Sequence, residues 1–228
     1  MKTSTTILFI MAIFISSCTE NPFKDIDPAI SINSVQFSKS LNNGDKLSRQ
    51  INKDVIEFNS GEKSDFFNDP NGKERYSNAP MLLTPVNNKE PFTFIARVSP
   101  EFSETYDAGA IYMFVNNDKW LKFAFEMDER KLTRIVTVRT NGTSDDNNHD
   151  VVAEKTVFMK ISSDAGSIGF YYSTDSINWQ LVRVFKNDFP STTYIGISSQ
   201  SPLGSGIKTT FESISLNNVV VKDFRKGI

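Results

Sequence analysis

From Met81 to the C-terminus, short apolar runs alternate with clusters of turn-forming residues such as Asn141-Gly142 and Ser201-Pro202. None of these runs combines helical length with a period of 3.6 residues. They predict strands at residues 81–84, 92–98, 109–115, 120–126, 132–139, 157–162, 167–174, 179–185, 193–199, 207–216 and 219–224. So many short strands without helices predict an all-β fold, a sandwich or a jelly roll, rather than an α/β fold.

Two of these runs form the clearest hairpin pattern of the chain, between Tyr106 and Glu126. The polar residues 116–119 separate the two runs and predict the turn. Successive side chains of a strand point to opposite faces, which gives the second run an apolar and a mixed face. The apolar face consists of Leu121, Phe123 and Phe125, and the mixed face consists of Trp120, Lys122 and Glu126. We expect the apolar face to pack between the two sheets.

Composition limits the classes of function that the chain can have. Its 228 residues are 39% hydrophobic, enough for a sizeable core, and carry a formal net charge of −2 from 25 basic and 27 acidic residues. The basic residues form no cluster, which argues against nucleic acid as a partner. A single Cys and a single His exclude a disulfide within the chain and zinc sites built from several such ligands.

The N-terminus has the pattern of a bacterial lipoprotein. Lys2 precedes a nine-residue apolar run at residues 7–15, which is too short for a permanent membrane span, and Ser16-Ser17-Cys18 follows at once. This arrangement predicts a signal peptide at 1–17, lipidation of Cys18 and anchoring in the bacterial envelope, on the outer membrane. Residues 18–31, with two prolines and little periodicity, are predicted to be a tether, and residues 32–228 a single β-sandwich domain.

Residues 64–80 read as a loop, because Asp-Pro, Asn-Gly and Ala-Pro breaks interrupt them. The pair Phe66-Phe67 is unusual in such a segment. One interpretation is that a phenylalanine pins the loop to the core, and the other is that Phe67 forms the wall of a binding site.

Further segments, taken in order, carry a family resemblance. They are residues 64–67, 99–102, 106–110, 120–122, 144–146, 172–185 and 200–202. Together they resemble a bacterial and fungal domain family of unknown biochemical function, named for regulation of enolase, in the concanavalin A-like lectin/glucanase superfamily. The resemblance covers roughly residues 55–216. It implies a concanavalin A-like jelly-roll sandwich of two antiparallel sheets, in agreement with the strand pattern, and it implies no catalytic residues.

A mixed polar and aromatic sheet face is typical of sugar-binding sandwiches, because aromatic rings cover sugar C–H faces while charged groups bind hydroxyls. The alternative is an ordinary solvated face. The candidate ligand-binding residues are Trp120, Lys122, Glu126, Arg139, Arg183 and Phe67.

Two clusters of acidic residues are candidate sites of chemistry. Glu126 and Asp128 approach the carboxylate spacing of jelly-roll glycosidases, but the third carboxylate is missing, and a solvated turn is the preferred interpretation. Residues 144–150 are rich in oxygen ligands, which makes Asp145 and Asp146 calcium candidates, although the calcium-loop spacing is absent. A flexible polar loop is preferred, and no other cofactor is expected.

The sequence therefore predicts an envelope lipoprotein whose lectin-like sandwich binds carbohydrate without catalysis. Its predicted partners are the membrane, through Cys18, and a glycan. The alternatives are a glycoside hydrolase-like enzyme and a structural or protein-interaction module of the envelope.

Overall fold

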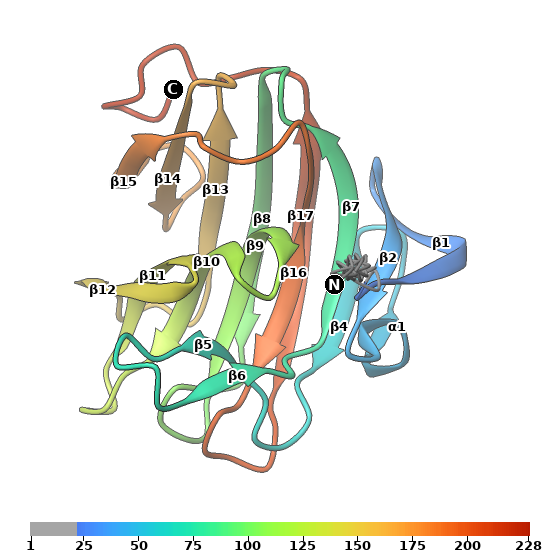
Figure 1. Ribbon diagram of the computed structural model, residues 1–228, viewed down its shortest axis with the longest axis vertical. Coiled ribbons are helices and arrows are strands. Elements are labelled where there is room, and N and C mark those ends of the chain that lie inside the picture. The colour runs from blue at the N-terminus through green and yellow to red at the C-terminus, as the bar shows by residue number, and fades with distance from the viewer. Residues whose placement is uncertain (1–21) are drawn as a thin grey trace, which may run out of the picture.

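The computed structural model describes residues 22–228, which form two large antiparallel sheets packed face to face (Figure 1). The larger sheet has eight strands, in the order β1 (Lys24–Ile32), β2 (Val35–Leu41), β7 (Met81–Asn87), β16 (Thr192–Gln200), β9 (Ala108–Asn116), β10 (Lys119–Met127), β11 (Thr133–Asn141) and β12 (Thr143–Val151). The smaller sheet has seven, in the order β15 (Gln180–Lys186), β14 (Ser167–Ser173), β13 (Val157–Ser163), β8 (Phe92–Pro100), β17 (Lys208–Asn217), β4 (Val55–Asn59) and β3 (Ser48–Gln50). The predicted jelly-roll sandwich of two antiparallel sheets is confirmed.

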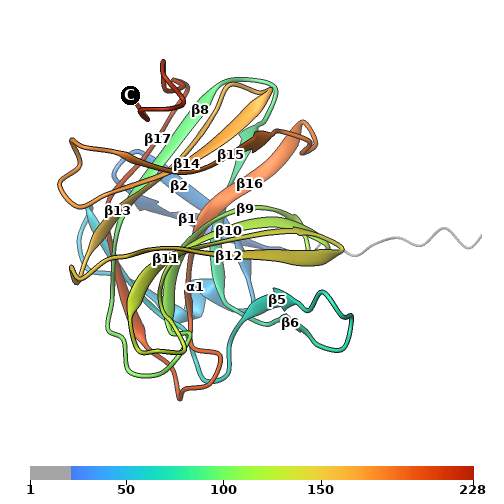
Figure 2. The ribbon, with the colours of Figure 1, turned by 90° about the vertical axis from the view of Figure 1, so that its left-hand side faces the viewer.

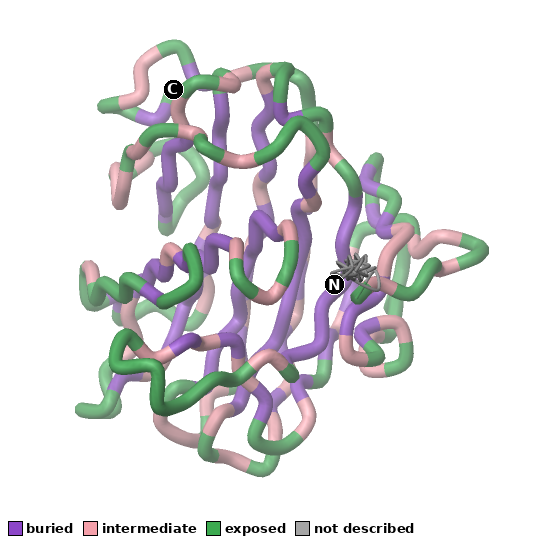
Figure 3. The backbone as a smooth tube through the Cα atoms, viewed as in Figure 1, coloured by how far each residue is buried: buried purple, intermediate pink, exposed green. Residues whose placement is uncertain are grey.

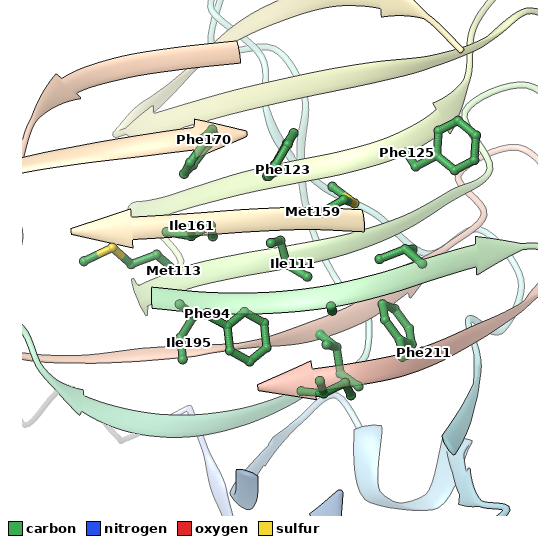
Figure 4. Close-up of a cluster of buried hydrophobic side chains, with 14 of the residues drawn as sticks. Phe94, Ile111, Met113, Phe123, Phe125, Met159, Ile161, Phe170, Ile195 and Phe211 are labelled. Carbon is green, nitrogen blue, oxygen red and sulfur yellow. The ribbon is translucent and has the colours of Figure 1, made fainter. Parts of the chain in front are cut away.

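The main core lies between the two sheets, where the inward faces of their strands meet (Figure 4). Leu121, Phe123 and Phe125 of β10 belong to this core, as their alternation predicts. Phe123 stacks on Phe170 of the opposite sheet, with ring centroids 5.0 Å apart and an interplanar angle of 9°. Burial of these faces supplies most of the apolar area removed from water on folding.

A second apolar cluster lies on the other face of the larger sheet. There the short hairpin of β5 (Phe66–Asn68) and β6 (Arg75–Ser77) lies beside the β9–β12 part of that sheet (Figure 2). Phe66 is fully buried and packs edge-on against Tyr112, Phe114 and Trp120. The hairpin residues beyond β5 are largely exposed (Figure 3). The hairpin is thus a third layer over one half of the sheet.

Asn68 fixes the hairpin at its other end. Its Nδ2 donates to the backbone oxygens of Asn117, at 3.1 Å, and Gly142, at 3.0 Å. Its backbone N–H donates to Ser144 Oγ at 2.9 Å. Because Phe66 and Asn68 are both held, the residue between them, Phe67, has a defined position on the hairpin's other side.

Several predictions about individual segments are wrong. Residues 24–31 of the expected tether belong to β1, which pairs with β2 at the edge of the larger sheet. The expected polar loop at 144–150 is the edge strand β12, paired with β11. Residues 219–224 form no strand, and their backbone bonds instead to the outer face of the smaller sheet, where Val221 N–H donates to Ser162 Oγ at 3.1 Å.

The helical content of the described residues is the single turn α1 (Gly44–Leu47). Within residues 22–228, no helix has the length and apolar character that a membrane span needs. The predicted signal peptide at 1–17 and the lipidated Cys18 lie outside the described residues.

Candidate functional site

A pocket of about 300 Å³ opens between the hairpin and the outer face of the larger sheet. Strands β10 and β12 form its floor and one side, the β5 hairpin forms another, and the loops after residues 105 and 201 close one end. Its lining consists of Asp65, Phe67, Tyr106, Lys122, Glu126, Glu129, Asp146, Asn148 and Pro202. The pocket therefore combines one ammonium group, several carboxyl groups and two aromatic rings.

The register of the sheet explains why these side chains meet. Lys122 of β10 pairs with Val138 of β11, and Val138 pairs with Asp146 of β12. These three residues therefore form one row across the same face of the sheet. Glu126 lies on that face too, four residues further along β10. The residue between them on this face, Ala124, is small and leaves space for the side chains of Lys122 and Glu126.

Lys122 is only 4% exposed and its ammonium group is fully engaged. Nζ donates to the backbone oxygen of Phe66 at 3.0 Å, to Asp65 Oδ1 at 3.3 Å and to Gln200 Oε1 at 3.3 Å. Burial lowers the pKa of Lys122, but the nearby carboxylates, Asp65 first, outweigh burial and leave it raised. Lys122 thus stays charged and ties the hairpin to the sheet.

Glu126 is 9% exposed, and within residues 22–228 its carboxyl group takes part in no hydrogen bond or ion pair. Burial raises the pKa of Glu126 to about 8, and Asp146 and Asp65 add to the effect while Lys122 opposes it. The group therefore holds its proton near neutral pH, although it lines an open pocket.

Aromatic rings form the walls. Phe67 and Tyr106 line the charged pocket and also a neighbouring pocket of about 490 Å³, which Tyr76, Pro202 and Leu203 share. Because several residues line both, the two pockets form one groove. Tyr106 has a φ of 68°, a left-handed conformation that costs a non-glycine residue free energy and occurs preferentially at functional sites. Its N–H donates to Met127 O at 2.7 Å, which holds the ring at the pocket mouth.

The two interpretations of Phe66-Phe67 each describe one residue. Phe66 is the pin to the core, and Phe67 is the partly exposed pocket wall. Of the sequence-derived ligand candidates, the structure brings Phe67, Lys122 and Glu126 together in the pocket.

Trp120 does not reach the groove. It is on the predicted face of β10 but is fully buried under Phe66, and its Nε1 donates to Asn117 O at 3.3 Å. The prediction of Trp120 as a ligand contact is wrong because a third layer, invisible in the alternation of β10, covers it.

Arg139 lies on the inward face of β11, and Arg183 lies on β15 of the smaller sheet, so neither lines the groove. Arg139 is directly opposite core residue Leu121, and its Nη2 contacts Asp188 Oδ2 at 2.8 Å. Arg183 reaches across from β15 to Asp145 Oδ2, also at 2.8 Å. Both arginines therefore join the sheets electrostatically, and their prediction as contacts of the same ligand as Lys122 is wrong.

The acidic residues of each predicted cluster lie in different environments. Asp145 pairs with Arg183 on one side of β12, whereas Asp146 lines the pocket on the other, because successive side chains of a strand point to opposite faces. These two side chains cannot bind one calcium ion together, and no group of three or more His, Cys, Asp or Glu residues suited to a metal occurs within 22–228. Asp128 is 1% exposed and accepts from Arg134, which removes it as the catalytic partner of Glu126.

Sequence reasoning missed Asp65, Tyr106 and Pro202 as pocket residues. They come from loops, where no periodicity assigns a face. Gln200, whose Nε2 donates to Tyr112 Oη at 2.5 Å while its Oε1 accepts from Lys122, was also missed. The sequence feature that could have indicated Gln200 is its position as a polar residue at the end of a largely buried strand.

A model of the family described as "Protein of unknown function (DUF1349)" matches residues 41–219, well over half of the chain. This chain belongs to the DUF1349 family. No match was found among the curated proteins. Among solved structures, this DUF1349 protein is similar to a functionally unknown protein of Saccharomyces cerevisiae, with 23% identity, a TM-score of 0.72, and coverage of 80% of this chain and 96% of that one.

Longer chains contain a similar domain. A GH43 glycoside hydrolase with endo-xylanase and exo-arabinofuranosidase activity is 14% identical, with a TM-score of 0.61 over 90% of this chain and 42% of that one. A xylan β-1,4-xylosidase of Bacillus halodurans is 12% identical, with a TM-score of 0.56 over 72% and 32%. The DUF1349 chain thus spans less than half the length of these enzymes, and at such identities the likeness concerns the fold.

Proposed function

We propose that this DUF1349 protein binds carbohydrate, without catalysis, in the groove between the β5–β6 hairpin and the larger sheet. The observation that carries the proposal is the composition of the groove: aromatic and prolyl walls at Phe67, Tyr106 and Pro202 stand around charged groups of Lys122 and Glu126. Rings cover the C–H faces of a sugar, while carboxyl and ammonium groups bind its hydroxyls. The similarity in fold to parts of xylan-degrading enzymes is consistent with this class of ligand.

The test is a binding screen with purified residues 22–228 against neutral, basic and acidic oligosaccharides, followed by calorimetry on every hit. Phe67→Ala is expected to weaken a hit by about tenfold, since stacked aromatic contacts contribute about 1 kcal/mol or more. Arg183→Gln is the matched control, because Arg183 lies on the smaller sheet, lines neither pocket and should leave affinity unchanged. Absence of any glycan hit, or equal affinities for wild type and Phe67→Ala, would refute the proposal.

We further propose that the protein is an envelope lipoprotein anchored through Cys18. The support is the sequence pattern of residues 1–18. Labelling with a radioactive fatty acid in a bacterial host should modify the full chain and not its Cys18→Ala variant. A labelled Cys18→Ala variant, or an unlabelled wild type, would contradict lipidation.

A glycoside hydrolase is the second candidate. It is favoured by the protonated carboxyl of Glu126, since a general acid must hold a proton at working pH, and by the carboxyl of Asp146 in the same pocket. A screen of aryl glycosides and xylan-type polysaccharides tests it: turnover that Glu126→Gln abolishes would support hydrolysis, and turnover that Glu126→Gln retains would remove Glu126 from it.

A further inference from the structure

The charges of the pocket do not balance. Four carboxyl groups line it, from Asp65, Glu126, Glu129 and Asp146, against the single ammonium group of Lys122. That ammonium group is committed to Asp65, Phe66 O and Gln200. Glu129 pairs with Arg130, with Nε and Oε1 3.6 Å apart, whereas Glu126 and Asp146 have no ion-pair partner within residues 22–228. These two carboxyl groups leave the pocket room for a positive charge from elsewhere.

The carboxyl group of Glu126 indicates where in the pocket a positive charge would bind. Its side chain is more than nine-tenths buried, it lines the pocket, and within residues 22–228 it has neither a hydrogen-bond nor an ion-pair partner. A buried polar group without a partner costs free energy, and most such groups in proteins are satisfied. The neighbouring Asp128, in contrast, is satisfied by Arg134 and by backbone N–H groups. Glu126 thus has an unfilled place for a donor inside the pocket.

The lining of the adjoining pocket indicates which chemical group of the ligand lies beside the hydrogen-bond donor. It is lined by Tyr76, Leu203, Phe67, Tyr106 and Pro202, together with Lys63 and Asp65. Tyr76 and Leu203 are exposed at 43% and 61%. Exposed rings and apolar side chains beside a charged pocket suit a ligand with a flat C–H face next to a cationic group, and aromatic rings also attract a neighbouring cation.

We propose that the groove binds an amino sugar with a free amine, its ammonium group directed at Glu126 and an adjoining sugar ring packed on Phe67 and Tyr76. The inference rests on the proposed carbohydrate binding and narrows it to glycans with N-unsubstituted hexosamine units. An ammonium group supplies hydrogen-bond donors and a charge, which together satisfy Glu126 and offset the excess of carboxyl groups.

The experiment compares disaccharides that share a β-1,4-linked backbone and differ in one group. Calorimetry at neutral pH is carried out with the glucosamine disaccharide, its N-acetylated form and cellobiose, and with spermidine as a cation without sugar. We expect the glucosamine disaccharide to bind at least about tenfold more tightly than each of the other three ligands.

Glu126→Gln keeps the size of the side chain and removes the carboxyl group, which can give up its proton when an ammonium group binds beside it. It is expected to weaken the glucosamine disaccharide by about tenfold or more and to change cellobiose binding by less than about twofold. Glu154→Gln, at an exposed position that lines neither pocket of the groove, is the matched control and should leave the affinity unchanged. Thermal unfolding of each variant verifies that the fold is intact.

The outcomes separate the two proposals. Equal binding of all three disaccharides would overturn amine recognition and leave carbohydrate binding standing. Binding of spermidine as tight as that of the glucosamine disaccharide would overturn the sugar part. Binding of none of the three disaccharides would overturn amine recognition, and carbohydrate binding would fall with it only if the wider glycan screen also gave no hit. An unchanged affinity for the glucosamine disaccharide in a folded Glu126→Gln variant would overturn the assignment to Glu126.

Discussion

The ring of Phe66 stands edge-on to the indole of Trp120, with centroids 5.9 Å apart and an interplanar angle of 82°. Both side chains are fully buried, although one comes from a three-residue strand outside the two large sheets. This contact holds the β5–β6 hairpin on the larger sheet, and the next residue, Phe67, is held at the groove as a result.

Substitution of Phe66 by Ala should therefore mainly lower stability, whereas substitution of Phe67 by Ala should mainly weaken ligand binding. Phe66→Ala is expected to lower the free energy of unfolding by about 3–5 kcal/mol, because it leaves a cavity beside Trp120, and to shift Trp fluorescence to longer wavelength. Phe67→Ala, at a partly exposed wall, should cost less than about 1.5 kcal/mol and act on ligand binding. Urea denaturation of both variants tests the contrast, and equal losses of stability would contradict it.

Lys122 is expected to stabilise the protein through the groups it satisfies. Lys122→Met removes the charge at similar length and takes the ammonium donor away from Asp65 Oδ1 and Gln200 Oε1, at an expected cost of about 3 kcal/mol. Asp65→Asn in the same chain should restore part of this loss, because the unpaired carboxylate disappears. A double-mutant cycle by chemical denaturation measures the coupling, and strictly additive losses would show that the pair is independent.

The raised pKa of Glu126 predicts a dependence of stability on pH. Its value rises from the ordinary 4.5 to about 8, through burial and the neighbouring Asp146 and Asp65, against the effect of Lys122. Between these values the folded chain holds a proton that the unfolded chain releases, so this contribution is complete below about pH 4.5 and is lost as pH rises towards 8.

Unfolding free energies of wild type and Glu126→Gln at several pH values test this linkage. Wild type should lose stability relative to the variant by at most about 1.4 kcal/mol per pH unit within that window. Other titrating groups are common to both chains and cancel in the difference. Parallel stability curves would show that Glu126 titrates normally.

How well the environment of a strand residue could be predicted from sequence depends on whether one or both faces of the strand are buried. For β10 the period of two assigned Phe123 to the core correctly, but it could not show that Trp120 is covered, since that requires a hairpin distant in sequence. Strand β12 was missed because polar residues fill nearly all of both its faces at the sheet edge, which removes the alternation.

The pocket residues on β10 could be predicted from sequence, whereas those on loops could not. Lys122 and Glu126 were found because a strand fixes their common face. Asp65 and Tyr106 were not, since loops fix positions through individual contacts such as the bond from Tyr106 N–H to Met127 O. The sequence predicts a tether where β1 forms, because Pro28 and its acidic neighbours resemble a linker, whereas pairing with β2 decides the structure of this segment.

Lys160 on β13 is expected to hold the C-terminal segment against the smaller sheet. Its Nζ lies 3.4 Å from the ring centroid of Trp179 and donates to Gly227 O at 2.8 Å, and Tyr171 Oη donates to Phe224 O at 3.0 Å. Lys160→Met removes a cation–π contact and a hydrogen bond, for an expected loss of about 1–2 kcal/mol that falls mainly on this segment.

Amide hydrogen exchange locates this loss. The N–H groups of Asp223 and Gly227, which bond to Ile228 O and Asp223 O, should exchange about tenfold faster in Lys160→Met, while those of β10 should not change. Lys155→Met, at an exposed position shortly before β13, is the matched control and should leave the segment protected. Unaltered protection at Gly227 in Lys160→Met would mean that Tyr171 and the backbone bonds hold the segment without Lys160.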